Sequence, residues 1–471
     1  MELSQQDVAR IVEVVVQRLG KSPSPSANGD HQLPTGIYGS LDEAVRAAHE
    51  AQRKIGNLEF RGKILAAIRS AGVDHAQELA ELAVEETGMG RVEDKVQKNR
   101  SQAEKTPGIE MLAPEALSGD HGLTLIENAP WGVIASVTPS TNPAATIINN
   151  SISMIAAGNA VVFAPHPGAK RVSQRAIAVM NDAIIAAGGP AGLITTVAEP
   201  SIEMAQQLFR YPGIGLLVVT GGEGVVREAR RLTDKRLIAA GAGNPPVVVD
   251  ETADVERAAH CIVAGASFDN NIVCADEKEI IAVDSIADRL KEAMAGKGAY
   301  ELTPSQGEEI ARIVLNNYPG PKPTPNKKWI GKDAVLFARE IGLTIPDATR
   351  LLFVETDKGH PFAQLELMMP IIPLIRVPNA NTAIDVAIEL EHGYHHTAAM
   401  HSRNLDNLHR MATEINTSVF VKNGSCLAGL GFGGEGWTTM TISTPTGEGV
   451  TCARTFVRLR RCVLVDHFRI V

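Results

Sequence analysis

WGVIASVTPSTNPAATIINNSISMIAAGNAVVFAP (131–165) is the stretch that decides the fold, because it contains one complete strand–helix–strand unit. The run WGVIASV is typical of a buried strand, ATIINNSISMIAAG of a helix, and VVFAP of the next strand. Further β-type runs follow at LITTVA (193–198), IGLLVVTGG (214–222) and KRLIAAG (235–241). This alternation predicts an α/β fold with βαβ units, a parallel sheet, and ligands at the carboxyl ends of the strands.

The flanking segments extend this organisation to the whole chain. Residues 41–105 follow a helical pattern, and TLIEN (124–128) and WGVIASV are expected to form a strand pair. A second α/β series starts near PPVVVDETADVERAAH (245–260), and a β-type tail without helical period ends the chain. Such a tail predicts pairing with another subunit. The expected units are a first α/β domain at 37–245, a second at 246–435, and a β arm at 436–471 with a contribution from 121–137.

The first twenty residues form a unit of their own. Their apolar residues recur at helical spacing and give one apolar stripe, made of Val8, Ile11, Val12, Val15 and Leu19. The Ser/Pro/Gly-rich segment 21–36 is typical of a flexible linker. A short tethered helix cannot bury such a stripe within itself, so it needs a partner. Docking on its own domain is the alternative.

Composition excludes several function classes. The net charge of −9 and the lack of a basic run argue against nucleic acid. No apolar stretch reaches the roughly 18 to 20 residues of a membrane span, and no secretory signal begins the chain. Five cysteines without a CxxC pair argue against a disulfide framework or a zinc site. We therefore expect a cytosolic protein with reduced thiols.

A glycine turn is the first candidate for a binding site. Gly221, Gly222 and Gly224 follow a strand and precede a helix, the order that presents backbone N–H groups to a phosphate. This is not the G-x-G-x-x-G fingerprint, so a plain structural turn stays open as the alternative.

Asn142 is the second candidate. Pro143 fits the first turn of a helix, which places Asn142 at the N-cap. Either the side chain caps the helix, or its amide lies in the pocket at the end of the strand as a hydrogen-bond donor to an oxyanion.

Cys274 is the candidate nucleophile, because it lies in the polar stretch SFDNNIVCADEK (267–278) rather than in a core pattern. Cys261 lies in a helical pattern that favours core packing, and Cys452 and Cys462 belong to the β-type tail. Cys426, in a Gly-rich loop, is the alternative nucleophile. No Lys, Arg or His adjoins Cys274, so nothing in the sequence explains how its thiol is activated.

Three histidines lie within seven residues: His395, His396 and His401. No cysteine or acidic residue stands at a metal-ligand spacing from them. We therefore predict histidines that line a surface or pocket, and no metal.

Together these segments resemble the aldehyde dehydrogenase superfamily, and within it the CoA-acylating enzymes of bacterial microcompartments. The resemblance covers essentially the whole chain and follows the family's order. It is carried by ETGMGRVEDK (86–95), ENAPWGVIASVTPSTNPA (127–144), FAPHPGAK (163–170), VTGGEGVV (219–226), AAGAGNPPVVVDETAD (239–254), GASFDNNIVCADEK (265–278), ELMMP (366–370), HHTAAMHS (395–402), GGEGWTTMTI (433–442) and TPTGEGVT (444–451).

The resemblance implies a Rossmann-like cofactor domain, an α/β catalytic domain and a β oligomerisation arm. It makes Cys274 the catalytic thiol, Asn142 the oxyanion donor, and Glu366 the partner of the nicotinamide ribose. NAD is the implied cofactor and CoA the cosubstrate. The implied cofactor-binding residues are Thr138, Pro139, Ser140, Thr141, His166, Pro167, Gly168, Thr220, Gly221, Gly222, Val225, Ala240, Gly241, Ala242, Glu366 and Leu367.

One departure from the superfamily bears on the reaction. Hydrolytic members carry Glu-Leu-Gly-Gly where this chain has Gly241-Ala242-Gly243, so the base that activates water is missing. A thiol needs less help than water, which favours release of the acyl group by CoA. A hydrolytic dehydrogenase and a non-catalytic cargo scaffold are the alternatives, and acetaldehyde and propionaldehyde stay equally open as substrates.

The resemblance also implies partners. Residues 1–20 resemble the encapsulation peptides that dock cargo enzymes on microcompartment shell or cargo proteins. The expected location is the cytoplasm, inside a microcompartment, and the expected assembly is a homodimer or homotetramer.

Overall fold

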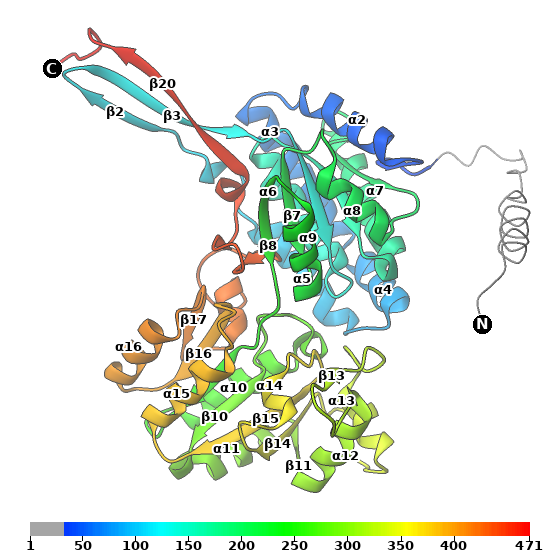
Figure 1. The fold of residues 1–471 in the computed structure, drawn as a ribbon, viewed down its shortest axis with the longest axis vertical. Coiled ribbons are helices and arrows are strands. Elements are labelled where there is room, and N and C mark those ends of the chain that lie inside the picture. The colour runs from blue at the N-terminus through cyan, green and yellow to red at the C-terminus, as the bar shows by residue number, and fades with distance from the viewer. Residues whose placement is uncertain (1–32) are drawn as a thin grey trace, which may run out of the picture. The chain divides into compact units, whose positions relative to one another are not determined.

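The computed structural model of the protein describes residues 33–471, which are coloured in Figure 1. Residues 35–471 form one unit, whereas the predicted helix at 1–20 and most of the predicted linker at 21–36 lie outside the described residues. No helix among the described residues is long and apolar enough to cross a membrane.

The chain opens with a helical region, as predicted for residues 41–105. Ser40 begins the first helix with a capping box, because its side chain accepts from the Glu43 N–H while the Glu43 carboxylate accepts from the Ser40 N–H. The helices are α2 (Leu41–Gln52), α3 (Leu58–Asp74), α4 (Ala76–Thr87) and α5 (Val92–Lys105).

Six parallel strands form the first sheet, in the order β1-β6-β5-β4-β7-β8. The chain adds β5 and β6 on one side of β4 and then returns to add β7 and β8 on the other, so the order reverses between β4 and β7. The strands are β1 (Ile37–Tyr38), β4 (Val133–Thr138), β5 (Ala160–Pro165), β6 (Ile194–Val197), β7 (Leu216–Thr220) and β8 (Arg236–Ala240). The helices between them are α6 (Pro143–Ala156), α7 (Lys170–Ala186), α8 (Ile202–Arg210) and α9 (Glu223–Leu232).

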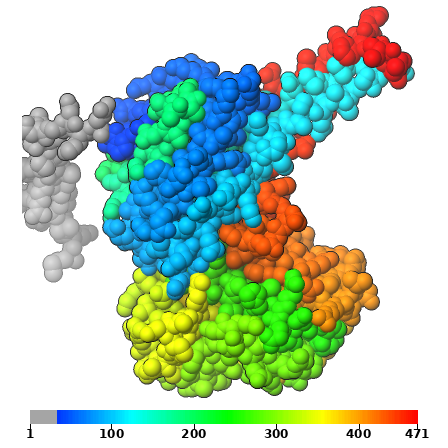
Figure 2. Space-filling view, turned by 180° about the vertical axis from the view of Figure 1, so that it is seen from behind, coloured from blue at the N-terminus to red at the C-terminus, as the bar shows by residue number. Residues whose placement is uncertain are grey.

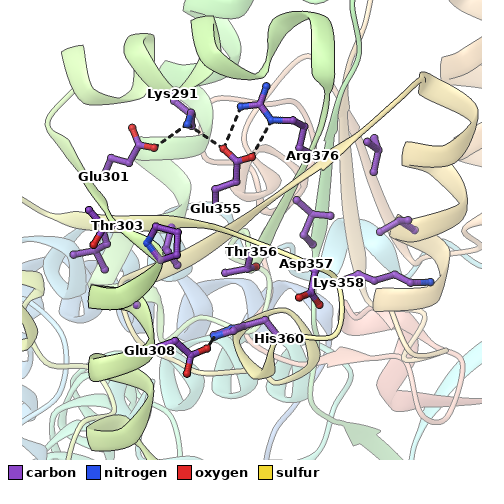
Figure 3. Close-up of a pocket in the computed structure, with 17 residues that line it drawn as sticks. Lys291, Glu301, Thr303, Glu308, Glu355, Thr356, Asp357, Lys358, His360 and Arg376 are labelled. Carbon is purple, nitrogen blue, oxygen red and sulfur yellow. Dashed lines mark hydrogen bonds and ion pairs between the residues drawn. The ribbon is translucent and has the colours of Figure 1, made fainter.

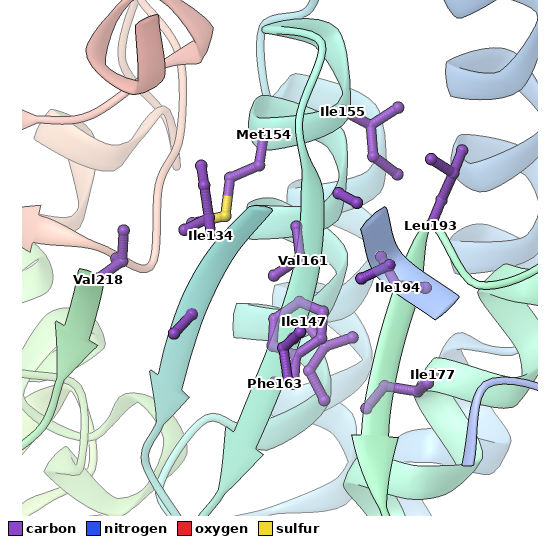
Figure 4. Close-up of a cluster of buried hydrophobic side chains, with 14 of the residues drawn as sticks. Ile134, Ile147, Met154, Ile155, Val161, Phe163, Ile177, Leu193, Ile194 and Val218 are labelled. Atoms are coloured by element: carbon purple, nitrogen blue, oxygen red, sulfur yellow. The ribbon is translucent and has the colours of Figure 1, made fainter. Parts of the chain in front are cut away.

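Helices cover both faces of this sheet, with α2, α8 and α9 on one face and α6 and α7 on the other. Its central strands are buried on both sides and therefore carry continuous apolar runs. Figure 4 shows the resulting core, in which Phe163 of β5 packs with Ile147 of α6 and Ile177 of α7. The predicted Rossmann-like parallel sheet is confirmed.

The second sheet has seven parallel strands in the order β11-β14-β15-β10-β9-β16-β17. Alternate residues of β9 face opposite cores, because Val247 and Val249 pack with α10 and α11 while Val248 packs with α15 and α16. The strands are β9 (Pro246–Val249), β10 (Glu279–Val283), β11 (Ala299–Leu302), β14 (Leu351–Thr356), β15 (Ile371–Val377), β16 (Thr397–His401) and β17 (Val419–Lys422). The helices are α10 (Val255–Ala266), α11 (Asp284–Gly296), α12 (Pro304–Val314), α13 (Ala334–Glu340), α14 (Pro361–Gln364), α15 (Ala380–Leu390) and α16 (Leu405–Glu414).

A third, antiparallel sheet joins β2 (Glu115–Gly119), β3 (Gly122–Pro130) and β20 (Val457–Val465). The cyan and red strands lie side by side in Figures 1 and 2. The predicted pairing of TLIEN with WGVIASV is wrong, since TLIEN lies in β3 between β2 and β20 whereas WGVIASV supplies β4 of the first sheet. Both segments alternate as strands do, but alternation does not specify the partner.

Only part of segment 436–471 lies in this three-stranded sheet. Residues 438–446 instead pack on the first sheet, where the Thr446 hydroxyl accepts from the Ala239 N–H at 2.9 Å. Two short antiparallel pairings complete the strands among the described residues, namely β12 (Leu315–Asn316) with β13 (Thr324–Pro325) and β18 (Ile442–Ser443) with β19 (Gly449–Val450).

Candidate active site

The predicted cofactor residues of the first sheet lie together at its carboxyl edge. Segment 138–141 follows β4, His166–Gly168 follows β5, Thr220–Gly222 follows β7, and Ala240–Ala242 follows β8. Strand order reverses between β4 and β7, and ligands bind in the crevice at such a reversal. Thr138 supports this location, since its buried hydroxyl has no hydrogen-bond partner among residues 33–471.

The glycine turn leaves its backbone open. Gly222 is the N-cap of α9, and no atom lies within 4 Å of the position that a Cβ would take at Gly222 or Gly224. Both glycines therefore leave room for a ligand to reach the N–H groups at the start of a ten-residue helix. The residues present thus fit a dinucleotide pyrophosphate.

The reactive residues lie at the amino edge of the second sheet. Gly243 precedes β9, Cys274 precedes β10, Glu366 precedes β15 and His396 precedes β16, and these four strands are neighbours. A Cβ at Gly243 would lie 2.8 Å from the Cys274 carbonyl oxygen and 2.9 Å from Cγ of His396. Because Gly241–Gly243 connect β8 to β9, this edge faces the carboxyl edge of the first sheet.

Cys274 is partly exposed, and its surroundings oppose ionisation. Burial and, second to it, the Glu366 carboxylate raise the pKa of the Cys274 thiol to about 12. Lys278 acts in the opposite direction, and sequence reasoning missed this residue because it lies four positions beyond the cysteine. Its ammonium donates to the Asn271 carbonyl at 2.8 Å and the Val273 carbonyl at 3.1 Å, which fixes the loop that carries the thiol.

Glu366 is half-buried between the two sheets. Burial raises the pKa of its carboxyl group to about 7, and a hydrogen bond from the Gly243 N–H partly offsets this. The residue therefore lies close to both Cys274 and the glycine segment.

Asn142 occupies the N-cap of α6, but its side chain makes no capping bond. The capping alternative is wrong. Its amide oxygen instead accepts from the Lys98 ammonium, and its Nδ2 donates to the Thr141 hydroxyl at 3.2 Å. The side chain is therefore held by α5 rather than by its own helix.

The other cysteines lie in different surroundings. Cys426 is fully buried in the core of the second sheet, where burial holds the pKa of its thiol well above the usual range. Cys261 lies on α10, Cys452 is buried, and Cys462 is exposed on β20. Of the five thiols, only that of Cys274 lies at the edge between the two sheets.

The three histidines do not share a site. His395 bonds to the Asn416 carbonyl at 3.0 Å, His396 bonds to the Thr397 hydroxyl at 2.9 Å, and His401 is buried on β16. Within residues 33–471, no group of three His, Cys, Asp or Glu side chains is arranged to hold a metal ion.

A threonine-rich segment over the first sheet is a part of the site that sequence reasoning missed. Asn149 of α6 accepts from the Thr439 hydroxyl at 3.0 Å and the Met440 N–H at 3.2 Å, and Asn150 accepts from the Thr441 hydroxyl at 3.0 Å. Thr441 also bonds to Thr220 at 3.2 Å. This segment therefore covers the end of β7. The clustered threonines of TTMTIST (438–444) and the motif GGEGWTTMTI (433–442) were signals for it, but no site residue was predicted there.

A separate groove lies at the carboxyl edge of the second sheet (Figure 3). Its charged side chains bond to one another, with Lys291 between Glu301 and Glu355, Arg376 on Glu355, and His360 beside Glu308. The lining residues, all in the described part of the chain, include none of the predicted site residues. This groove therefore lies outside the reactive cluster.

The two facing edges are those of an oxidoreductase-like α/β protein. A glycine turn of the kind that binds dinucleotides lies on one edge, and a cysteine lies on the other. A family model described as the aldehyde dehydrogenase family matches residues 31–306, and the chain belongs to this family. It is 63% identical over 470 residues to the acetylating acetaldehyde dehydrogenase EutE of Salmonella typhimurium, covering 100% of both chains.

Solved structures agree with this assignment. A propionaldehyde dehydrogenase of Rhodopseudomonas palustris, with bound CoA and an acylated cysteine, matches with a TM-score of 0.90 and 46% identity over 93% of this chain and 99% of that one. A propionaldehyde dehydrogenase from the Clostridium phytofermentans fucose utilisation microcompartment matches with a TM-score of 0.90 and 43% identity over 93% and 100%.

Proposed function

We propose that this chain is an NAD-dependent, CoA-acylating aldehyde dehydrogenase that uses Cys274 as its nucleophile. The observation that carries the acylating subtype is the closed space at Gly241, where a Cβ would lie 2.8 Å from Cγ of Pro445. A proline ring cannot turn aside as a flexible side chain can. The segment Gly241–Gly243, which matches the one that supplies the water-activating glutamate in hydrolytic relatives, therefore has no carboxylate, and at Gly241 it has no room for a side chain.

The proposed reaction uses residues from both the carboxyl edge of the first sheet and the amino edge of the second. The Cys274 thiolate adds to the aldehyde carbon, and the oxyanion is held by the Asn142 amide and the Cys274 N–H. When bound at the glycine turn, NAD would accept the hydride that leaves the former aldehyde carbon. Glu366 would hold its nicotinamide ribose, and residues 220–222 would hold its pyrophosphate. The acyl group, left on Cys274 as a thioester, then passes to the thiol of CoA. We assign cofactor binding to 37–245 and catalysis to 246–435.

The surroundings of Cys274 favour a short aldehyde. Cys274 packs against a small apolar cluster that also contains the partly buried Phe432. The other members are Ala145, Phe268, Val273, Ala275, Leu427, Leu430, Met440 and Ile442. We propose acetaldehyde as the substrate, because the acetylating relative is 63% identical whereas the two propionaldehyde dehydrogenases are 46% and 43% identical. One methylene changes the binding energy by only about 1 to 3 kcal/mol, so propionaldehyde is expected to be a slower substrate.

The test is NADH formation by the purified protein from acetaldehyde and NAD, with and without CoA. Sustained turnover with CoA, and a burst of one equivalent per site without it, is the expected result. Equal turnover without CoA would show that another group activates water. Absence of even the burst would overturn the assignment of Cys274 itself.

We further propose that residues 1–20 direct the enzyme into a microcompartment, since the Clostridium phytofermentans relative comes from one. Fusing residues 1–20 to a fluorescent protein should bring it into purified shells. A chain starting at Gly36 should keep its specific activity but stay outside the shells. Loss of activity in the shortened chain would point instead to a packing role.

The three-stranded arm supports the proposed dimer or tetramer. Leu459, Val463 and Val465 lie on one face of β20 and are 65%, 58% and 68% exposed. Exposed apolar rows of this kind mark contact surfaces. Replacing Leu459 and Val463 with Asp should lower the mass measured by light scattering, whereas an unchanged mass would place the interface elsewhere.

A further inference from the structure

Lys98 of α5 is a buried lysine that joins two segments of the active site. Its side chain is 2% exposed, and its ammonium donates to Oδ1 of Asn142 and to Oδ2 of Asp269. Asn142 begins α6, whereas Asp269 lies five residues before Cys274. A single ammonium group therefore links the oxyanion donor to the loop that carries the nucleophile.

The contact with Asn142 fixes which way the amide lies. An ammonium group has only donors, so it can face the oxygen of the amide but not its NH2 group. Nδ2 is therefore held on the side away from Lys98, where one hydrogen bonds to Thr141 at 3.2 Å. The second hydrogen has no partner among residues 33–471 and is free for a substrate oxygen. The positive charge also polarises the amide, which strengthens that N–H as a donor.

The contact of Lys98 with Asp269 fixes the distance between Asn142 and the loop that carries Cys274. Asp269, Asn270 and Asn271 all have positive φ, between 45° and 63°, a conformation that Asp and Asn adopt as single residues but rarely three in succession. Asp269 is held by its N–H, which donates to Asp94 at 2.9 Å, and by its carboxylate, which accepts from the Arg91 N–H at 2.7 Å. Ala145 of α6 packs in the same apolar cluster as Cys274. The start of α6, where Asn142 lies, is therefore held near the thiol.

A second lysine allows Lys98 to be replaced without leaving the Asp269 carboxylate unpaired. Lys95 also donates to the Asp269 carboxylate, at 3.0 Å, and donates to the Thr141 carbonyl at 3.1 Å. Neither of these hydrogen bonds of Lys95 goes to the Asn142 side chain. It is therefore a matched control, a buried lysine of the same helix on the same carboxylate.

We propose that Lys98 is a positioning residue for the oxyanion site, which orients the Asn142 amide and sets its spacing from the Cys274 loop. This proposal rests on the proposed function, in which Asn142 stabilises the oxyanion. Lys98 acts through Asn142, so its contribution to rate disappears when the amide is absent.

The experiment is a double-mutant cycle on the burst rate of NADH formation, with Lys98→Met, Asn142→Ala and the double variant. Lys98→Met is expected to lower the burst rate about tenfold or more in the native background, and to change it less than about twofold in the Asn142→Ala background. Lys98→Gln, whose amide can still donate to Asn142, is expected to lose less than Lys98→Met. Lys95→Met should lower the rate by the same factor in both backgrounds.

Thermal unfolding of each variant separates folding from positioning. If Lys98→Met fails to fold, the Lys98→Gln cycle takes its place. Equal factors for Lys98 substitution in both backgrounds would overturn the positioning role while leaving Asn142 in place. A full burst rate in Asn142→Ala alone would instead overturn the role of Asn142, and the proposal for Lys98 with it.

Discussion

The two facing edges of the protein bind and react by different means. The carboxyl edge of the first sheet offers backbone, with open space at Gly222 and Gly224. The amino edge of the second sheet offers ionisable side chains, many of them buried, including Asp276, Glu277 and Glu279. Backbone N–H groups bind an anion without needing to change charge, whereas a nucleophile must ionise.

In open α/β sheets, ligands usually bind at the carboxyl ends of the strands. The candidate site of this protein follows that rule in the first sheet only. The second sheet has a groove at its carboxyl edge, but the charges in that groove already bond to each other (Figure 3). The predicted catalytic residues lie at the opposite end, which the connection Gly241–Gly243 joins to the carboxyl edge of the first sheet. Connectivity therefore brings the two candidate edges together.

The largest expected effect is at the thiol. Cys274→Ala should reduce NADH formation to background, with and without CoA, because the proposed reaction forms its acyl intermediate on this thiol. NAD binding, measured by calorimetry, should be unchanged, because the binding edge is separate. Cys426→Ala is the control and should keep its burst, since that thiol is buried in another core. Activity that survives in the first variant and disappears in the second would exchange the two roles.

Removal of the oxyanion donor comes next. Asn142→Ala should lower the burst rate by about 10² to 10³, the usual cost of one such donor. Helix α6 should be stable, because Asn142 makes no side-chain capping bond. An unchanged melting temperature together with a reduced burst would separate this role from capping. A large loss of stability would favour the capping role that the structure contradicts.

Sequence patterns predicted the apolar part of this molecule better than its buried polar part. Continuous apolar runs identified the strands of the first sheet, and the polar stretch around Cys274 stood out from core patterns. Helix α5 has the sequence VEDKVQKNRSQAEK, which is typical of a solvated helix, yet its Asp94, Lys95 and Lys98 are buried. They are buried because they pair with Asp269 and Arg350 from segments far along the chain. Periodicity cannot reveal partners that only the tertiary fold supplies.

The binding edge should respond differently from the reactive edge. Gly222→Val should raise the KM for NAD by about tenfold or more with a smaller change in kcat, since the side chain would occupy the space of the pyrophosphate. The fold should tolerate it, because Gly222 has an extended backbone and an open Cβ position. Gly296→Val, at another open position, is the matched control on α11. Equal KM values in both variants would mean that the glycine turn is structural only.

The smallest expected effect tests how the two edges communicate through Glu366. Its carboxylate raises the pKa of the Cys274 thiol, so Glu366→Gln should lower that pKa and speed alkylation of Cys274 by iodoacetamide in the absence of NAD. The sign depends on pH, because only the ionised carboxylate opposes the thiolate.

With the pKa of Glu366 at about 7, the rate ratio of variant to native protein should be close to one at pH 6 and should rise through pH 7 to a plateau above pH 8. Glu277→Gln is the matched control, since burial also raises the pKa of Glu277 to about 7 but its charge is not among the causes acting on Cys274. A ratio that stays constant across this range would show that Glu366 and Cys274 do not interact. A ratio that follows the ionisation of Glu366 would instead mean that the residue proposed to hold the ribose also opposes ionisation of the Cys274 thiol, in addition to the larger effect of burial.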